Sequence, residues 1–314
     1  MADQHSSTKI VLVMLSTGTQ GGGVVKALAK ANEVLNKDPA PWLILAQTRD
    51  PTSAKSKALA SLPGIRLLKG VPTDPATLFL SAPGPVYGVF SVQQSYENPK
   101  GVEGEVLEAK ALAKEAAKHG VKHFVYTEPR ASPRGPAPVF ESKRKVEEYI
   151  ARNLPNLPTT ILRPTTFMDQ LVAGDPTSVF AKITKLIMLT QLKPDTRLQF
   201  IAGSDIGGFA ALALQNPEQY LGKVIDLAGD GLTPKDLADG WREVFGTEMR
   251  PKIMGGETLA WGVRAMRKEL RLMFRFFNEV GFNTDIPALR AEYPEVKDWR
   301  TFLRTEVPKS APLY

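Results

Sequence analysis

Leu15-Ser16-Thr17-Gly18-Thr19-Gln20-Gly21-Gly22-Gly23 stands between two regular elements of the chain. Residues 9–14 before it form an apolar run typical of a buried strand, and residues 21–36 after it have helical spacing. A strand, a glycine-rich turn and a helix in this order predict a loop that holds the pyrophosphate of a dinucleotide. The glycines allow close approach, and the helix N-terminus supplies N–H donors. The alternative is a turn that only joins strand to helix.

The glycines of this loop have the spacing of a dinucleotide-binding motif, with one departure. Gly18 and Gly21 occupy the second and third glycine positions, whereas Leu15 occupies the first. The first glycine normally makes the tight turn out of the strand, so we expect the geometry of this turn to differ from the usual one. The predicted cofactor-binding residues of the loop are Thr17, Gly18, Thr19, Gln20, Gly21 and Gly22.

The end of the second predicted strand, residues 42–47, bears on the choice of dinucleotide. Arg49 follows this strand, and an arginine at this place favours the 2′-phosphate of NADP(H). Lys55 and Lys57 are placed to assist it. Asp50 is the next residue, and an acid there would favour NAD, so the sequence leaves that alternative open. A second alternative is that Arg49 is an ordinary surface side chain.

Strands alternate with helical stretches along the first half of the chain. This alternation predicts an α/β fold with a doubly wound parallel sheet and helices on both faces. We expect residues 1–165 to form the dinucleotide-binding domain and residues 166–314 to form mainly a smaller, interleaved C-terminal lobe, with residues 198–230 returning to the sheet. The six predicted strands are residues 9–14, 42–47, 65–68, 86–91, 122–127 and 159–163.

Composition narrows the classes of function. The 314 residues include no cysteine, which excludes disulfides, thiolate metal sites and cysteine nucleophiles. His119 and His123 precede a strand, at the amino end of the sheet, so we expect neither a histidine-based hydrolase nor a metal site. A net charge of +7 favours an anionic ligand over direct contact with nucleic acid. The polar start lacks the apolar core of a signal peptide, and we expect a cytoplasmic protein without a membrane partner.

An ordered set of short segments runs along the sequence. They are residues 17–22, 48–50, 88–90, 123–127, 142–147, 162–169, 204–207, 226–230 and 276–282. Together these segments resemble the NmrA-like family, which belongs to the atypical short-chain dehydrogenase/reductases. The resemblance covers nearly the whole chain, and its late segments are most similar to fungal members. It implies a Rossmann domain that binds NADP(H), and either a reductase of small-molecule biosynthesis or a regulator that senses NADP(H).

The resemblance also indicates catalytic candidates. Lys143 stands at the family's lysine position, where it can bind the nicotinamide ribose and move a proton, but Val139 occupies the place of the usual tyrosine. The alternative for Lys143 is a surface lysine on a charged helix. Thr127 ends the fifth strand, where hydroxyl groups contact nicotinamide in this superfamily, and Asp169 follows the sixth strand, facing substrate. Gln93 follows the fourth strand and is a further candidate for contact with the cofactor.

Two functions fit these residues. The first is an NADP(H)-dependent oxidoreductase of fungal secondary metabolism that reduces a C=C, C=N or C=O group, with or without coupled cyclisation or isomerisation. The second is a non-catalytic NADP(H)-sensing regulator, present in the cytoplasm or nucleus, that binds a protein partner. The substrate of the enzyme would be a largely apolar small molecule, although most of the residues suited to its pocket also suit a core. They are Phe140, Phe167, Met168, Phe180, Trp241, Trp261, Phe274 and Phe277.

Overall fold

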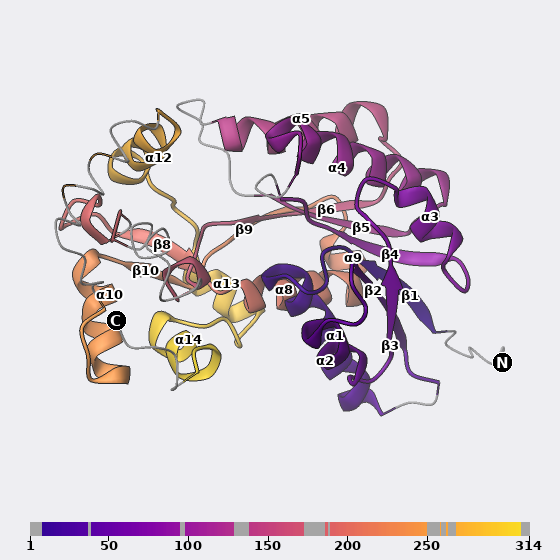
Figure 1. Cartoon of the computed structure of the whole chain (residues 1–314), viewed down its shortest axis with the longest axis horizontal. Helices are drawn as coiled ribbons and strands as arrows, with labels where there is room; N and C mark the ends of the chain where they lie inside the picture. The colour runs from indigo at the N-terminus through magenta and orange to yellow at the C-terminus, as the bar shows by residue number, and fades with distance from the viewer. Residues whose placement is uncertain are drawn as a thin grey trace. The chain divides into compact units, whose positions relative to one another are not determined.

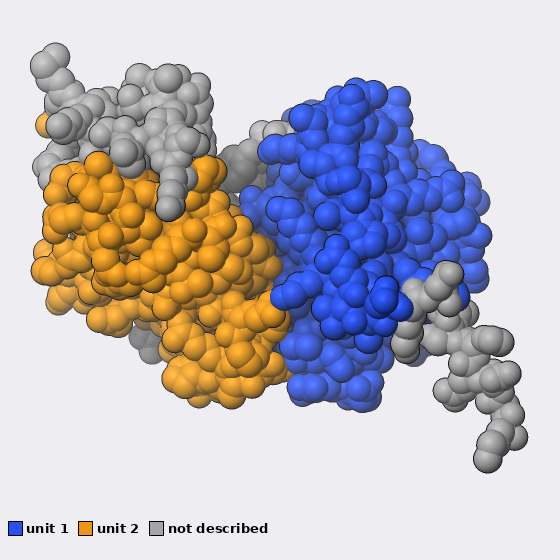
Figure 2. Space-filling model, turned by 90° about the horizontal axis from the view of Figure 1, so that it is seen from below, with its two compact units in different colours: residues 1–128, 141–163, 206–225 blue, residues 129–140, 164–205, 226–314 orange. Residues whose placement is uncertain are grey.

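The structure is a computed structural model, and its description covers most of the chain. Two compact units emerge, and each is described by itself (Figure 2). Unit 1 consists of residues 1–128, 141–163 and 206–225, and unit 2 of residues 129–140, 164–205 and 226–314. The described residues are 8–36, 39–94, 98–128, 138–172, 186–187, 189–249, 258, 262 and 268–308.

A seven-stranded sheet is the centre of the larger fold (Figure 1). Its order, β3-β2-β1-β4-β5-β6-β9, places the first strand in the middle, and the pairs from β3 to β6 are parallel. The sheet confirms the predicted α/β, doubly wound, Rossmann-type fold. The strands are β1 (Lys9–Val13), β2 (Trp42–Thr48), β3 (Ile65–Lys69), β4 (Val86–Ser91), β5 (His123–Thr127), β6 (Thr159–Pro164) and β9 (Val224–Leu227).

Helices cover both faces of this sheet because its strands are apolar on both sides. Alternate residues of β5, Phe124 and Tyr126, pack in one core with Leu112 of α4 and Val146 of α5. Figure 1 shows α4 and α5 on that face and α1 and α8 on the other. These helices are α1 (Thr19–Leu35), α2 (Ala54–Ala60), α3 (Pro75–Leu80), α4 (Gly101–Lys118), α5 (Pro138–Asn153), α8 (Gly203–Gln215) and α9 (Pro217–Tyr220).

Unit 2 has its own small sheet and its own core. The order of this sheet is β10-β8-β7, and the core around it contains Trp241, Phe274 and Trp299, all buried. Thr233 and Asp236 form a reciprocal capping box that begins α10. The elements are β7 (Thr166–Phe167), β8 (Leu198–Ile201), β10 (Asp230–Leu232), α6 (Asp169–Val172), α10 (Pro234–Phe245), α12 (Lys268–Glu279), α13 (Ile286–Glu292) and α14 (Trp299–Glu306).

The returning segment is narrower than the predicted residues 198–230. Strand β8 pairs with β7 and β10 in the small sheet, so it does not join the seven-stranded sheet as expected. Residues 206–225 do belong to unit 1, and β9 lies beside β6. From residue 141 onward, the chain therefore passes into unit 2 at residue 164, returns to unit 1 at 206 and enters unit 2 again at 226.

No helix among the described residues combines the length and the apolar character needed to cross a membrane. In the same part of the chain, no three His, Asp or Glu side chains are grouped so that they could hold a metal ion.

Candidate active site

The predicted phosphate loop leads into an uncapped helix. Helix α1 begins at Thr19 with Gly18 as its N-cap, and no described side chain caps its first turn. That turn carries no acidic residue either. The first N–H groups of a helix have no partner within the helix, and together they attract an anion. The sequence Gly18–Gly21 therefore builds a cradle suited to a pyrophosphate group.

Gly21 and Leu15 set the geometry of this loop. A Cβ on Gly21 would lie 2.4 Å from the Leu15 carbonyl oxygen and 2.5 Å from that of Met14, so only glycine fits there. Leu15 has φ +48°, in the left-handed region that glycine adopts without strain. The residue at the first motif position thus holds a conformation that costs a leucine about 1–2 kcal/mol.

Gln47 anchors the loop to the sheet, a role that sequence reasoning missed. Its side-chain Oε1 accepts a hydrogen bond from Leu15 N at 2.9 Å, and its Nε2 donates to Gly70 O at 2.7 Å. Its carbonyl oxygen accepts from the hydroxyl of Ser16 at 2.7 Å. Gln47 is buried at the end of β2 and so links the loop after β1 to the loop after β3. A buried glutamine at a strand end was the available signal.

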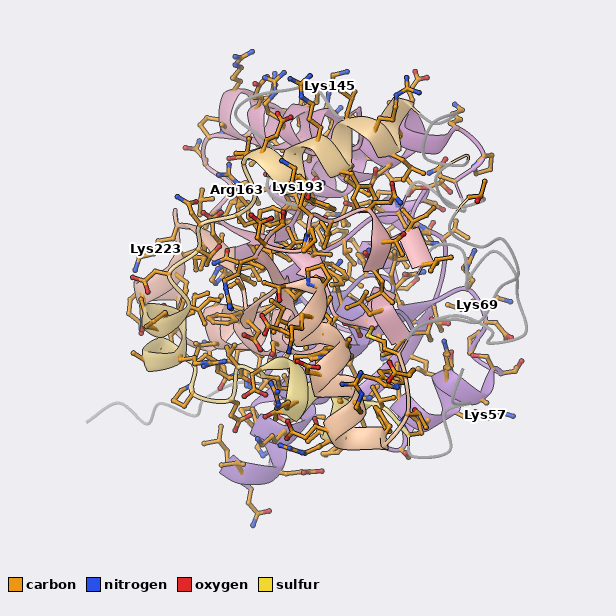
Figure 3. All side chains as sticks on the ribbon, turned by 90° about the vertical axis from the view of Figure 1, so that its left-hand side faces the viewer. Lys57, Lys69, Lys145, Arg163, Lys193 and Lys223 are labelled. Atoms are coloured by element: carbon orange, nitrogen blue, oxygen red, sulfur yellow. The ribbon has the colours of Figure 1, made fainter. Side chains whose placement is uncertain are left out.

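Basic side chains gather where β2 and β3 end. Arg49 is exposed just after β2, and Lys69 is exposed at the end of β3, where it pairs in register with Thr48. Lys57 lies on α2, and Figure 3 labels it and Lys69. The predicted helper Lys55 is also exposed on α2. Lys69 was missed because only strand register brings it to this edge.

Asp50 does not offer a free carboxylate at this edge. Its Oδ1 accepts hydrogen bonds from the Thr52 hydroxyl at 2.6 Å and from Thr52 N at 2.8 Å. These bonds hold the pKa of Asp50 below its usual range, and the charge of Lys69 adds to the effect. The carboxylate is thereby used in a local turn. Asp50, the acid that made NAD an alternative, is hydrogen-bonded to Thr52, and Arg49 before it is exposed.

The carboxyl ends of β4 and β5 carry two further predicted residues. Thr127 is buried, and its hydroxyl donates to Gln20 Oε1 of the phosphate loop at 2.8 Å. The structure therefore brings two predicted site residues into contact. Gln93 is also buried, and its Nε2 donates to the Ser91 hydroxyl at 3.0 Å at the end of β4.

A buried acid follows Thr127, and the sequence did not single it out as a site residue. Glu128 is 1% exposed and lies 3.4 Å from Nε of Arg163 at the end of β6. Arg163 in turn contacts both carboxylate oxygens of Glu147 on α5, at 2.6 and 2.7 Å. Burial, and then hydrogen bonding to Glu147, raise the pKa of Glu128 to about 9. Perturbed acids of this kind gather at functional sites.

The two remaining catalytic candidates are not brought together. Lys143 lies on α5 by its backbone, and its side chain is outside the described part of the structure. Asp169 belongs to unit 2, where its Oδ2 accepts a hydrogen bond from Gly203 N at 2.8 Å and burial raises its pKa. That bond gives Asp169 a structural role at the start of α8. Its predicted contact with substrate stays a prediction, as does the role of Lys143.

The apolar candidates for a substrate pocket are mostly core. Met168, Trp241, Phe274 and Phe277 are buried together in unit 2, and Phe167 is half-buried. The side chains of Phe140, Phe180 and Trp261 lie outside the described residues.

Comparisons with known proteins agree with this architecture. The NmrA-like oxidoreductase malD of Malbranchea aurantiaca is 26% identical over 303 residues, covering 89% of this chain and 86% of that protein. The structure of NmrA, a negative transcriptional regulator, in complex with NADP superposes with a TM-score of 0.69 at 16% identity, covering 97% of both chains. Triphenylmethane reductase of Citrobacter sp., complexed with NADP(H), gives 0.66 at 18% identity, covering 94% of this chain and 99% of that one. The model of the NmrA-like family matches residues 7–303, which confirms the resemblance seen in the sequence: the chain belongs to the NmrA-like family.

Proposed function

We propose that this protein is an NADP(H)-dependent oxidoreductase that reduces a C=C, C=N or C=O group of a small, largely apolar molecule. The observation that supports NADP(H) as the cofactor is the group of basic side chains where β2 and β3 end. Asp50 is bonded to Thr52 there, while Arg49 and Lys69 are exposed. The names of relatives such as malD support oxidoreductase chemistry, and a role in fungal secondary metabolism fits the same relatives.

The described residues fit this cofactor. The open first turn of α1 suits the pyrophosphate, and Gly21 keeps that turn close to the end of β1. Arg49 and Lys69 would hold the 2′-phosphate, because a guanidinium and an ammonium group are the usual partners of phosphate. When bound, NADPH would supply the hydride for the reduction.

The chain's own residues would orient the reaction at the end of β5. The bond from Thr127 to Gln20 ties the end of β5 to the first turn of α1, and so fixes two elements that flank the cofactor. Lys143 is our candidate for binding the nicotinamide ribose and for moving a proton. Gln93 is our candidate for a further polar contact with the cofactor, and Asp169 for contact with substrate.

Fluorescence titration with NADPH and NADH tests the cofactor. We expect tighter binding of NADPH, and the variants Arg49→Ala and Lys69→Ala should each weaken NADPH binding by about tenfold or more, since hydrogen bonds to charged groups contribute about 1.5–3 kcal/mol. NADH binding should not change in either variant. Lys118→Ala, which removes an exposed lysine at the end of α4, is the control. Equal affinities for both dinucleotides in the wild type would contradict the proposal.

Turnover is tested by following NADPH consumption with a quinone, a conjugated enone and an imine as probes. Lys143→Ala should abolish consumption while far-UV circular dichroism stays unchanged. Unaltered consumption in this variant would remove Lys143 from the mechanism.

A regulator that senses NADP(H) is the second candidate function. Val139 at the place of the usual tyrosine favours it, and one protein of similar fold is described as a negative transcriptional regulator. This candidate predicts tight NADP(H) binding, no consumption of NADPH with any of the probes, and a protein partner that binds differently to the NADP⁺ and NADPH forms.

A further inference from the structure

Three acids and a tyrosine gather in unit 1, between β5 and the helices on one of its faces. Tyr126 and Glu128 are alternate residues of one stretch, so their side chains leave the same face of the sheet. Glu105 comes from α4 and Glu147 from α5. Arg163, labelled in Figure 3, contacts Glu128 and Glu147 and so brings a cation to these acids. Glu105 and Glu128 are both at least 97% buried, at 3% and 1% exposure.

Glu128 and Glu147 share one guanidinium, because Arg163 lies 3.4 Å from Oε1 of Glu128 and 2.6 Å from Oε1 of Glu147. The interaction of the two acids raises the pKa of Glu128 and lowers that of Glu147. Two ionised carboxylates have only acceptors and repel each other, whereas a proton on one of them supplies a donor. Moreover, Glu128 Oε2 is buried and finds no donor among the described residues. A proton on one of the carboxyl groups turns this repulsive pair into a hydrogen bond.

The geometry assigns that proton to Glu128. Glu147 is 22% exposed and receives two short hydrogen bonds from Nη2 of Arg163, which stabilise a carboxylate. Glu128 is 1% exposed and has only the longer contact, 3.4 Å, with Nε of the same guanidinium. Burial alone would raise the pKa of Glu147, but its bonds with Glu128 and Arg163 lower it. Glu147 is therefore the anion and Glu128 the neutral acid.

Tyr126 provides an independent observation. Its side chain is fully buried, and its hydroxyl has no hydrogen-bond partner among the described residues. Burial raises the pKa of Tyr126, and the neighbouring acids Glu128, Glu105 and Glu147 raise it further, so the hydroxyl keeps its proton. An uncharged hydroxyl adds no positive charge to this group of acids, and the cation Arg163 contacts two of them, Glu128 and Glu147. One guanidinium balances Glu147, and this favours a neutral Glu128.

We propose that Glu128 is a positioning residue: as a neutral carboxylic acid it bridges the end of β5 to Glu147, and so fixes where position 143 of α5 lies. Positions 143 and 147 are one turn apart on the same face of that helix. Thr127, next to Glu128, is bonded to the phosphate loop. The bridge thus connects α5 to the strand end that adjoins the candidate cofactor site. The link to Lys143 rests on the proposed function; the protonated bridge does not.

Amide hydrogen exchange of the cofactor-free protein, corrected for the intrinsic effect of pH, tests the bridge. In the wild type, α5 should be protected at neutral pH and lose protection as the pH rises toward the pKa of Glu128, about 9, because two carboxylates then repel each other. In Glu128→Gln, whose amide is neutral and still donates, protection should stay high at both pH values. In Glu128→Ala it should be low at both. The amides of β1 serve as the internal reference.

Glu108→Gln is the matched control, because Glu108 is a half-buried acid of α4 whose pKa burial also raises, and it bonds to Asn98 instead of the pair. It should keep the alkaline loss of protection in α5. If Glu128→Gln does not fold, Glu147→Gln gives the same test: without the anion, Glu128 ionises against Arg163, and the alkaline loss should disappear.

The proposal is overturned if Glu128→Gln is as unprotected as Glu128→Ala at neutral pH, because Glu128 would then act as an anion. It is also overturned if wild-type α5 shows no alkaline loss, or if that loss persists in Glu147→Gln. If Glu128 served only to fill space, its substitution by Gln or Ala would lower the protection of α5, and the wild-type pH profile would show no step. NADPH titration of the same variants separates the two proposals: a wild type that binds no NADPH contradicts the proposed function and leaves the exchange result standing.

Discussion

Gly21 is the residue at which the start of α1 comes closest to the end of β1. An added Cβ would lie within 2.5 Å of two backbone oxygens, those of Leu15 and Met14, and backbone cannot move aside as a side chain can. Gly21→Ala should therefore lower the free energy of unfolding by about 1–3 kcal/mol, the usual cost of overpacking. It should also weaken NADPH binding. Urea denaturation and fluorescence titration measure the two effects.

Gly22→Ala is the control for this prediction. Its Cβ would meet one backbone oxygen, that of Ser16, at 3.2 Å, so a smaller loss is expected. Equal losses in the two variants would show that the close approach at Gly21 does not determine the result.

His123 makes the larger unit sensitive to acid. It is fully buried, and its Nε2 lies 2.7 Å from the Thr160 hydroxyl, which itself donates to Tyr220 O. Burial lowers the pKa of His123 from 6.5 to about 4. The folded state therefore binds this proton less readily than the unfolded chain, and stability is lost as the pH falls between these values. The loss should reach about 3 kcal/mol, at about 1.36 kcal/mol per pH unit.

Urea denaturation at neutral pH and near pH 4 measures this loss. His123→Gln should show a smaller difference between the two conditions, because its amide does not titrate. His119→Gln, which changes a histidine one-third exposed beside Glu115, should keep the wild-type difference. An unchanged acid loss in His123→Gln would assign the effect to other groups.

At the scale of elements, the sequence predicted those features that local pattern determines. Apolar runs located β1 to β6, and the turn after β1 located the phosphate loop, because each is contiguous in the chain. The contacts of Gln47, Lys69 and Glu128 were missed because they depend on which strands lie side by side. The small sheet was missed for another reason: its strands have two to four residues, too few to show a period.

The helices α1 and α8 meet through glycine. A Cβ on Gly207 of α8 would lie 2.2 Å from the carbonyl carbon of Gly23 and 2.4 Å from the backbone nitrogen of Val24, so the two helix backbones are nearly in contact. Gly207→Ala should push these helices apart and lower the free energy of unfolding by about 1–3 kcal/mol, although alanine is the better helix former. Thermal unfolding followed by circular dichroism measures the change. A stabilised variant would contradict the close packing.

At the scale of the whole molecule, the chain builds two separate cores. One joins the sheet residue Leu12 to Leu112 of α4 and Ile150 of α5, and the other joins Phe200 of β8 to Trp241 and Trp299. The chain passes between the units several times, so neither unit is one continuous segment. A substitution confined to one core therefore gives a direct measure of how cooperatively the two units unfold.

Lys297 joins two distant segments of unit 2 and provides that substitution. Its Nζ lies 2.7 Å from Oδ1 of Asp205, and its backbone N–H donates to Oδ2 at 2.8 Å. Asp205 is fully buried, so Lys297→Met leaves a buried carboxylate without its cation, which should cost about 3–5 kcal/mol. Lys235→Met, which breaks the exposed pair with Asp239, should cost less than about 1 kcal/mol.

Hydrogen exchange of Lys297→Met shows which unit loses stability. If α10 and α14 lose protection while β1 and β2 keep theirs, the two units unfold separately. An equal loss in both units means that the molecule unfolds as one. A Lys297→Met protein as stable as the Lys235→Met control would show that Asp205 does not depend on its cation.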